Sequence, residues 1–381
     1  MNKPRTKVAF FLPSLEGGGA ERSIVNLFKN LNKRNYKISL ILGERKGDFI
    51  EEVPKEVLIV DLKTSNSFKI FFKIIRYFRK EKPDIFISTF PRFNIINIIA
   101  KIFSKVKTKI IITERTTFSL LSTTAETFSH RLIARFLLPS LIRFIYPKAD
   151  VIVCISKGIA HDISKIIRYA DNKIRVIYNP VTDERIYKLA KESVKYTWFS
   201  NLEIPVILSV GRLIKAKDYP NLLQSFSLVL QKQPAHLVIL GEGTEKEKLK
   251  RVAQKLGIFK NVAFLGFQKN PYKYMARCSV FVLSSYREGF GDVLVEAMAC
   301  GVPVVSTNCP GPKDIIESGK NGILVPIDNK KALAEAILKV LNNPYLSYKL
   351  SKEGKKRASF FSIKKSAKEY EKLFQELLNL K

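Results

Sequence analysis

The sequence is short of the residues that hold metal ions or form disulfides. Its three histidines, His130, His161 and His236, are not spaced with a second ligand for a metal. Its four cysteines form no CxxC pair, so we expect reduced structural thiols in a cytosolic protein. No Asp-x-Asp pair occurs, which argues against a diphosphate held through a divalent cation. We therefore expect no metal and no cofactor.

Long apolar runs are also missing. No stretch approaches the ~18 residues that a helix needs to cross a bilayer. Lys3, Arg5 and Lys7 precede only a short apolar run before Pro13, which is too short for the core of a signal peptide. We expect a cytoplasmic protein that can meet a membrane only at its surface.

Acidic residues are few relative to basic ones. The sequence has 34 Asp and Glu against 66 Lys and Arg, a formal net charge of +32 at pH 7. Such a charge attracts nucleic acid, anionic lipid or phosphorylated substrates. Nucleic acid is disfavoured, because we find no clustered basic stripe with aromatic platforms. Arg131, Arg135 and Arg143 lie among large apolar residues, a pattern that suits an anionic membrane surface and equally a core-facing helix with solvated arginines.

Strand and helix signals alternate along the whole chain. Apolar runs such as Val8–Leu12 and Val280–Leu283 read as buried parallel strands, and Phe68–Lys82 reads as an amphipathic helix. This alternation predicts an α/β protein built from doubly wound parallel sheets.

The alternation weakens and turns polar between about Thr182 and Glu203. A chain of 381 residues is long enough for two domains of similar size. We therefore predict domains at 1–190 and 204–361, with a C-terminal helix at 362–381 as a candidate to pack back on the first.

A glycine-rich turn, PSLEGGGAER, runs from Pro13 to Arg22. Successive glycines between a strand and a helix let the backbone pass close to a ligand, so a phosphate or sugar can lie against the helix N-terminus. A plain βα turn explains the same residues. The spacing is not that of GxGxxG with an acidic residue about twenty positions on, so a nicotinamide nucleotide is weakly supported.

A second candidate site follows the first strand of the second domain. Arg212 and Lys217 lie just after the strand Pro205–Val210. Together they can neutralise a diphosphate and stabilise it as a leaving group. An exposed basic loop is the alternative. Gly241-Glu242-Gly243, after another strand, reads as a turn with at most a shaping role.

The stretch Tyr286–Pro312 contains a loop, a short apolar helix and a strand. Asp292 is predicted to cap the helix, and Gly301 to end it. Two carboxylates remain, Glu288 in the loop and Glu296 within the helix. A carboxylate on an apolar helix is costly unless it has a partner, and the hydroxyls of a ligand can be that partner.

Taken in order, GGGAER, GRLxxxK, LGEG, EGFGDVLVEAMACGVPVVST and NGILV resemble the family 4 retaining glycosyltransferases of the GT-B fold. The resemblance covers nearly the whole chain. It implies two Rossmann-like doubly wound domains facing across a cleft. The segment Cys309–Ile316, CPGPKDII, is similar to the branch that moves sugars from UDP onto lipid-linked oligosaccharides.

The resemblance also implies residue roles. Arg212 and Lys217 match the pair that grips the donor diphosphate, and Glu288 matches the glutamate beside the transferred sugar, so these three are the implied catalytic residues. Glu296 matches the glutamate that binds the ribose hydroxyls. The implied donor-binding residues are Gly18, Gly19, Arg212, Lys217, Gly289, Phe290, Gly291 and Glu296.

One position departs from the family pattern. Many members have a histidine after the fifth strand of the first domain, where this chain has Thr113-Glu114-Arg115-Thr116. Glu114 and Arg115 are therefore the candidates for the acceptor side.

The resemblance implies transfer of a hexosyl or N-acetylhexosaminyl group from a UDP-sugar to a saccharide or lipid-linked saccharide, with retention. Assembly of lipopolysaccharide, capsule or another cell-surface glycan is the expected process. We expect a peripheral protein on the cytoplasmic face of an anionic membrane, with no metal, no cofactor and no nucleic acid. The alternative is a GT-B sugar-nucleotide epimerase or a sucrose/trehalose-type synthase.

Overall fold

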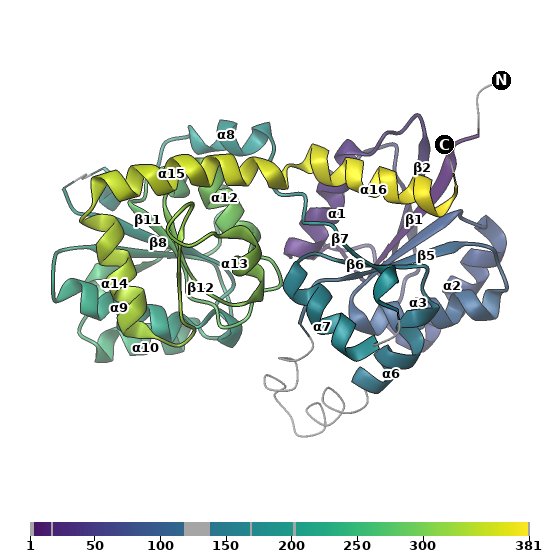
Figure 1. Ribbon diagram of the computed structural model, residues 1–381, viewed down its shortest axis with the longest axis horizontal. Helices are drawn as coiled ribbons and strands as arrows, with labels where there is room; N and C mark the ends of the chain where they lie inside the picture. Colours follow the sequence, from purple (N-terminus) through teal and green to yellow (C-terminus); the bar gives the residue numbers. More distant parts are fainter. Residues whose placement is uncertain (1–3, 17, 118–137, 168–169, 201–202, 380–381) are drawn as a thin grey trace. The chain divides into compact units, whose positions relative to one another are not determined.

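A computed structural model describes residues 4–16, 18–117, 138–167, 170–200 and 203–379 (Figure 1). The chain folds into two compact units: the first contains the residues up to Pro180 and those from Ile363 onward, and the second is Val181–Ser362. The second unit begins before the predicted domain end at 190, because the helix at 184–190 contacts helices of that unit. Helix α8 (Glu184–Ala190) starts at Asp183, whose carboxylate accepts the backbone N–H of Arg185.

The first unit is built on one parallel sheet. Its described residues form seven strands in the order β3-β2-β1-β4-β5-β6-β7. The strands are β1 (Thr6–Leu12), β2 (Tyr36–Leu42), β3 (Leu58–Asp61), β4 (Ile85–Thr89), β5 (Lys109–Glu114), β6 (Val151–Cys154) and β7 (Ile174–Val176). The chain order reverses between β1 and β4, which is where doubly wound sheets place their ligands.

Helices cover both faces of this sheet. They are α1 (Gly19–Asn30), α2 (Ser67–Glu81), α3 (Pro91–Ser104), α6 (Leu138–Ile145), α7 (Lys157–Ile167) and α16 (Ile363–Leu377). Helix α1 contacts α16, and α2, α3, α6 and α7 contact one another in that order. Right-handed crossovers put these two groups on opposite faces, as Figure 1 shows.

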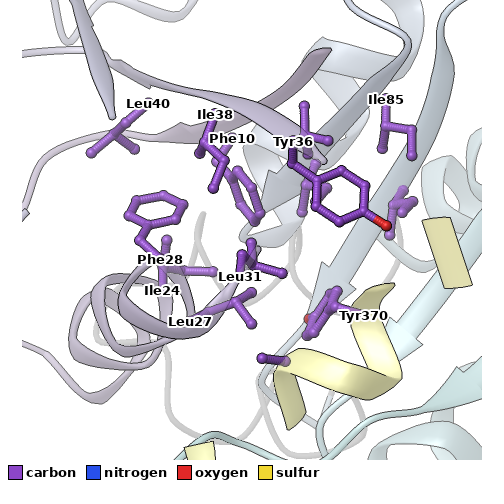
Figure 2. Packing of buried hydrophobic residues seen from close by; sticks show 14 of the residues in the cluster. Phe10, Ile24, Leu27, Phe28, Leu31, Tyr36, Ile38, Leu40, Ile85 and Tyr370 are labelled. Atoms are coloured by element: carbon purple, nitrogen blue, oxygen red, sulfur yellow. The ribbon is translucent and has the colours of Figure 1, made fainter. Parts of the chain in front are cut away.

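The core under α1 and α16 holds the C-terminal helix on the first unit (Figure 2). The rings of Phe10 and Phe28 meet edge to face at 4.8 Å, and those of Tyr36 and Phe374 meet at 5.4 Å. The backbone N–H of Asn32 also donates to a carboxylate oxygen of Glu371 on α16, at 2.7 Å. Residues far apart in sequence therefore share one apolar core.

The second unit is also built on one parallel sheet, which is smaller. Its described residues form six parallel strands in the order β10-β9-β8-β11-β12-β13. The strands are β8 (Val206–Val210), β9 (His236–Leu240), β10 (Val262–Phe264), β11 (Val280–Leu283), β12 (Val304–Thr307) and β13 (Ile323–Val325). The helices are α8, α9 (Tyr219–Leu230), α10 (Lys246–Lys255), α11 (Tyr272–Met275), α12 (Asp292–Cys300), α13 (Pro310–Ile315), α14 (Lys330–Leu341) and α15 (Pro344–Ala358).

All four cysteines are free thiols, as expected. Within the described residues, no helix is both long and apolar enough to cross a membrane.

Candidate active site

The predicted diphosphate and sugar residues meet at the carboxyl edge of the second sheet. Strands β8 and β11 are neighbours, so the loops that follow them lie side by side. The ammonium of Lys217 forms an ion pair with a carboxylate oxygen of Glu288. The hydroxyl of Ser284 donates to the backbone carbonyl of Lys217 at 2.8 Å. The structure therefore joins two residues that are 71 positions apart in sequence.

This ion pair is shielded from water but not sealed. The side chains of Lys217 and Glu288 are 17% and 19% exposed. A cation and an anion at such a site keep strong local fields, because little water screens them. The pair can also separate when a ligand supplies a better partner for either charge.

Arg212 lies one turn earlier in the same loop, with an exposed side chain. Within the described residues it has no ion pair and no side-chain hydrogen bond. Its five N–H donors remain available for an anion that approaches this edge of the sheet.

The glycine loop that follows Glu288 buries its aromatic ring. The side chain of Phe290 is buried and packs edge to face on Phe361, with ring centroids 5.2 Å apart. Gly291 has φ +102°, in the region that favours glycine. The prediction that Asp292 caps α12 is wrong: Gly291 is the N-cap and Asp292 is the first helical residue. Gly301 ends the helix as predicted, with φ +82°.

The buried carboxylate of Glu296 has a protein partner that sequence reasoning missed. The hydroxyl of Tyr272 on α11 donates to Glu296 Oε1 at 3.0 Å, and Glu296 is only 6% exposed. Tyr272 lies in a four-residue helix far from any recognised motif. Tertiary packing sets the position of Tyr272, so no local sequence pattern predicts its contact with Glu296.

The turn Gly241-Glu242-Gly243 supports the Arg212 loop through backbone contacts. The N–H of Gly211 donates to the carbonyl of Leu240 at 3.0 Å, and that of Leu213 donates to the carbonyl of Glu242 at 2.8 Å. The two glycines allow the two loops to approach this closely, since neither has a side chain to separate them.

In the first unit, Gly18 and Gly19 lie where the α1 helix begins, after the carboxyl end of β1. Gly18 is the N-cap, and no side chain caps the helix. The first turn of a helix carries free N–H groups and a positive partial charge. The carboxylate of Glu21 lies in this turn, against Gly18, so this end of α1 suits a hydroxyl better than a phosphate. Gly17 lies outside the described residues.

The two acceptor-side candidates occupy different environments. Glu114, the last residue of β5, is fully buried, and its Oε1 accepts hydrogen bonds from Tyr146 and from Asn94, the latter at 2.7 Å. Arg115 is half-buried and donates to Asn179 Oδ1 at 3.1 Å. A side chain buried like that of Glu114 cannot touch an acceptor.

Burial raises the pKa of Glu114 to about 8, opposed by the hydrogen bonds from Tyr146 and Asn94 and by the charge of Arg115. The native protein therefore keeps this proton at pH values where the unfolded chain, with its ordinary carboxyl pKa, loses it. Native stability should fall as pH rises from about 5 to about 8, by up to ~1.4 kcal/mol per pH unit.

Glu114→Gln cannot ionise, so this part of the pH dependence should disappear in the variant. Urea unfolding of both proteins at pH 5, 6, 7 and 8, fitted for the first unit, measures the difference between their slopes. Parallel slopes would show that Glu114 is already ionised in the native protein.

Part of the predicted membrane segment lies outside the described residues, including Arg131 and Arg135. Arg143 lies on α6 and is exposed. Within the described residues, no group of three or more His, Cys, Asp or Glu side chains is placed to hold a metal ion.

Known proteins resemble this chain in sequence and in fold. The family model "Glycosyltransferase Family 4" matches residues 17–185, and "Glycosyl transferases group 1" matches 191–357. Together the two matches take in most of the chain, which belongs to glycosyltransferase family 4. Its two Rossmann-like units are those of the GT-B fold.

One relative is the N-acetylgalactosamine-N,N'-diacetylbacillosaminyl-diphospho-undecaprenol 4-alpha-N-acetylgalactosaminyltransferase of Campylobacter jejuni. It is 35% identical over 230 residues, which are 60% of this chain and 61% of that protein, so the match spans less than two thirds of its length. An uncharacterized glycosyltransferase of Haemophilus influenzae is 27% identical over 96% of this chain and 98% of its own length.

Among solved structures, Anabaena HepE in complex with UDP and glucose has a TM-score of 0.78 and is 20% identical. The match covers 98% of this chain and 100% of that one. At this level of identity the likeness shows the fold.

Proposed function

We propose that this protein transfers a hexosyl or N-acetylhexosaminyl group from a UDP-sugar to a saccharide or lipid-linked saccharide. The observation that carries this proposal is the ion pair of Lys217 and Glu288 at the carboxyl edge of the second sheet. Arg212, in the same loop as Lys217, has no ion pair among the described residues. The two cations can stabilise a diphosphate, and the one anion can stabilise an electron-poor sugar. The names of the Campylobacter relative and of the HepE complex point to the same chemistry.

In the proposed reaction the bond between the sugar C1 and the diphosphate oxygen breaks, the acceptor hydroxyl oxygen bonds to C1, and the proton of that hydroxyl passes to the leaving diphosphate. The leaving diphosphate gains negative charge, which Arg212 and the ammonium of Lys217 stabilise. As Lys217 turns to the phosphate, the carboxylate of Glu288 is freed to face the positive charge that develops on the sugar. The Glu296 carboxylate, held by Tyr272, would accept hydrogen bonds from the ribose hydroxyls. We propose that the anomeric configuration is retained.

The acceptor is proposed to bind the first unit, at the edge formed by Gly18, Gly19 and Arg115. A lipid-linked acceptor would place the enzyme on the cytoplasmic face of a membrane, and the net charge of +32 favours an anionic one. Assembly of a lipopolysaccharide, a capsule or a related glycan is the proposed process.

The diphosphate is proposed to bind through Arg212 and Lys217 without a divalent metal. Arg212→Ala should therefore weaken UDP binding by about tenfold or more, since one charge-assisted contact is lost. EDTA should leave the UDP affinity unchanged. Calorimetric titration of UDP measures both effects. The control is Arg251→Ala, an exposed arginine on α10 of the same unit, which should leave UDP affinity unchanged. A large loss of affinity in EDTA would instead assign the diphosphate to a metal.

The proposed activity is tested with a set of radiolabelled UDP-sugars, a lipid extract of membranes as acceptor, and identification of the product. A labelled saccharide or lipid-linked saccharide supports transfer. A free sugar-nucleotide isomer, or a disaccharide of the sucrose or trehalose type, would identify the protein as an epimerase or a synthase.

A further inference from the structure

Three helices of the first unit expose large apolar side chains on one outer surface. Phe68 and Phe144 are each 71% exposed, and Phe103 is 59% exposed. Phe72, Ile102 and Leu141 are exposed as well. Soluble proteins seldom leave several aromatic residues together in water unless that surface has a partner. We call this surface, formed by α2, α3 and α6, the α2–α3–α6 face.

The three helices that carry these exposed residues are neighbours. The ring of Phe68 meets that of Phe72 at 4.9 Å, and the ring of Phe71 reaches Phe103 on α3 at 5.9 Å. Polar contacts join the same two helices: Arg92 Nε donates to Ser67 Oγ at 2.6 Å, near the beginning of both. Helix α6 contacts α3 on its other side, and Figure 1 shows all three helices on one side of the sheet.

The same face is strongly basic. Its helices carry a single acidic residue, Glu81, within their own bounds. Their basic residues are Lys69, Lys73, Arg76, Arg79 and Lys80 on α2, Arg92 and Lys101 on α3, and Arg143 on α6. Lys80 pairs with Glu81 at 3.9 Å, and within the described residues no other of these cations has an ion pair.

We infer that the α2–α3–α6 face docks on an anionic lipid bilayer, with the helices lying in the plane of the membrane surface. Aromatic and aliphatic side chains enter the boundary between headgroups and acyl chains, while Lys and Arg reach lipid phosphates. A nucleic acid would use the charge but would leave Ile102 and Leu141 uncovered. A second copy of this chain would bring two strongly basic faces together.

Docking in this way would bring the proposed acceptor edge close to lipid headgroups. Helices α2 and α3 begin after the carboxyl ends of β3 and β4. Phe68, at the beginning of α2, therefore lies toward the same edge of the sheet as the N-terminus of α1. A saccharide on a lipid diphosphate starts at the membrane surface, so the inference rests on the proposed function for its purpose, although lipid binding itself does not.

The test is flotation of the full chain at low salt with vesicles of phosphatidylcholine, alone and mixed with phosphatidylglycerol. The wild type should float with the mixed vesicles and much less with the neutral ones. Phe68→Ser combined with Phe144→Ser should weaken partitioning by roughly tenfold or more, since two exposed aromatic anchors are removed. Lys69→Glu combined with Arg76→Glu should weaken binding to the anionic vesicles at least as much.

A matched control exists in the second unit. Tyr345 and Tyr348 on α15 are 77% and 65% exposed and lie beside the exposed Lys349 and Lys352. Tyr345→Ser combined with Tyr348→Ser should leave flotation unchanged. Equal losses of flotation in the control and in the Phe68/Phe144 variant would overturn the inference, because nonspecific adsorption through exposed aromatic residues would then explain binding.

UDP titration of the same proteins separates this inference from the proposed function. All surface variants should bind UDP like the wild type. A wild type that binds UDP but floats with neither kind of vesicle overturns the docking face alone. A wild type that floats but does not bind UDP overturns the proposed function alone. A dimer in light scattering that the Phe68/Phe144 variant converts to a monomer, without flotation, assigns the face to self-association and overturns the inference.

Discussion

Glu288→Gln should reduce the rate of sugar transfer by about 10²–10³-fold, because it removes the negative charge proposed to face the developing positive charge on the sugar. UDP affinity should be retained or rise slightly. The reason is that Lys217, released from its ion pair, becomes a freer partner for the diphosphate. Gln keeps the volume of the side chain and can still accept the hydrogen bond that Ser285 Oγ donates to Glu288 Oε2 at 3.5 Å. The rate of product formation and the dissociation constant of UDP measure the two effects separately.

A matched control for this variant is Glu317→Gln in the same unit. Glu317 pairs with Lys320 at 2.8 Å, but both side chains are more than half exposed. Exposed pairs of this kind contribute only about 0–1 kcal/mol to stability, so the control should keep full activity. Transfer by Glu288→Gln within tenfold of the wild type would refute the proposed role. Loss of UDP binding together with a lowered melting temperature would indicate that Glu288 is structural.

The periodic parts of the fold are predictable from the sequence because their burial is simple. Buried parallel strands read as short apolar runs, and the strand predicted at Val280–Leu283 has those bounds in the structure. The helix predicted at Phe68–Lys82 is present as Ser67–Glu81. In both segments the local pattern of apolar residues is enough to predict the secondary structure. Helix α15 (Pro344–Ala358) was missed, because alternating Lys, Ser and Tyr residues leave only a weak apolar stripe.

The region between the domains shows how a polar segment can mislead. The polar composition of residues 182–203 interrupts the predicted alternation of strands and helices. The structure contains α8 there, with Asp183 as its cap and Ile186 buried. The Asp183 cap and the apolar residues that follow it indicate a helix, but the polar composition of the segment was given more weight in the prediction.

The sequence likewise predicts some residues of the candidate site and misses others. Glu288, Lys217 and Arg212 could be proposed from the sequence because each follows a strand, and parallel strands end at one edge. The bond from Tyr272 to Glu296 and the burial of Glu114 depend on where distant elements pack. Such contacts have no signature in a single stretch of sequence.

Gly241→Ala should destabilise the second unit by roughly 3–5 kcal/mol and weaken UDP binding as well. Gly241 has φ +137°, which side-chain-bearing residues rarely adopt. A Cβ atom there would lie 2.0 Å from the carbonyl oxygen of Gly211 and 2.9 Å from its carbonyl carbon. These are backbone atoms and cannot rotate away, so the loop that carries Arg212 would have to move. Calorimetry should show that the melting temperature of the second unit is lowered by about 10 °C. UDP titration should show a weaker affinity, because Arg212 is displaced.

Gly257→Ala separates the two causes of this effect. Gly257 also has a positive φ, +70°, but a Cβ atom there would meet nothing within 4 Å. This control carries only the conformational penalty, about 1 kcal/mol, and should bind UDP normally. The difference between the two alanine variants then measures the close approach of the β8 and β9 loops. Equal melting temperatures would mean that the loops part easily, and that the glycine turn does not hold Arg212 in place. A lowered UDP affinity in Gly241→Ala but not in Gly257→Ala would show that this turn supports the donor site through its backbone.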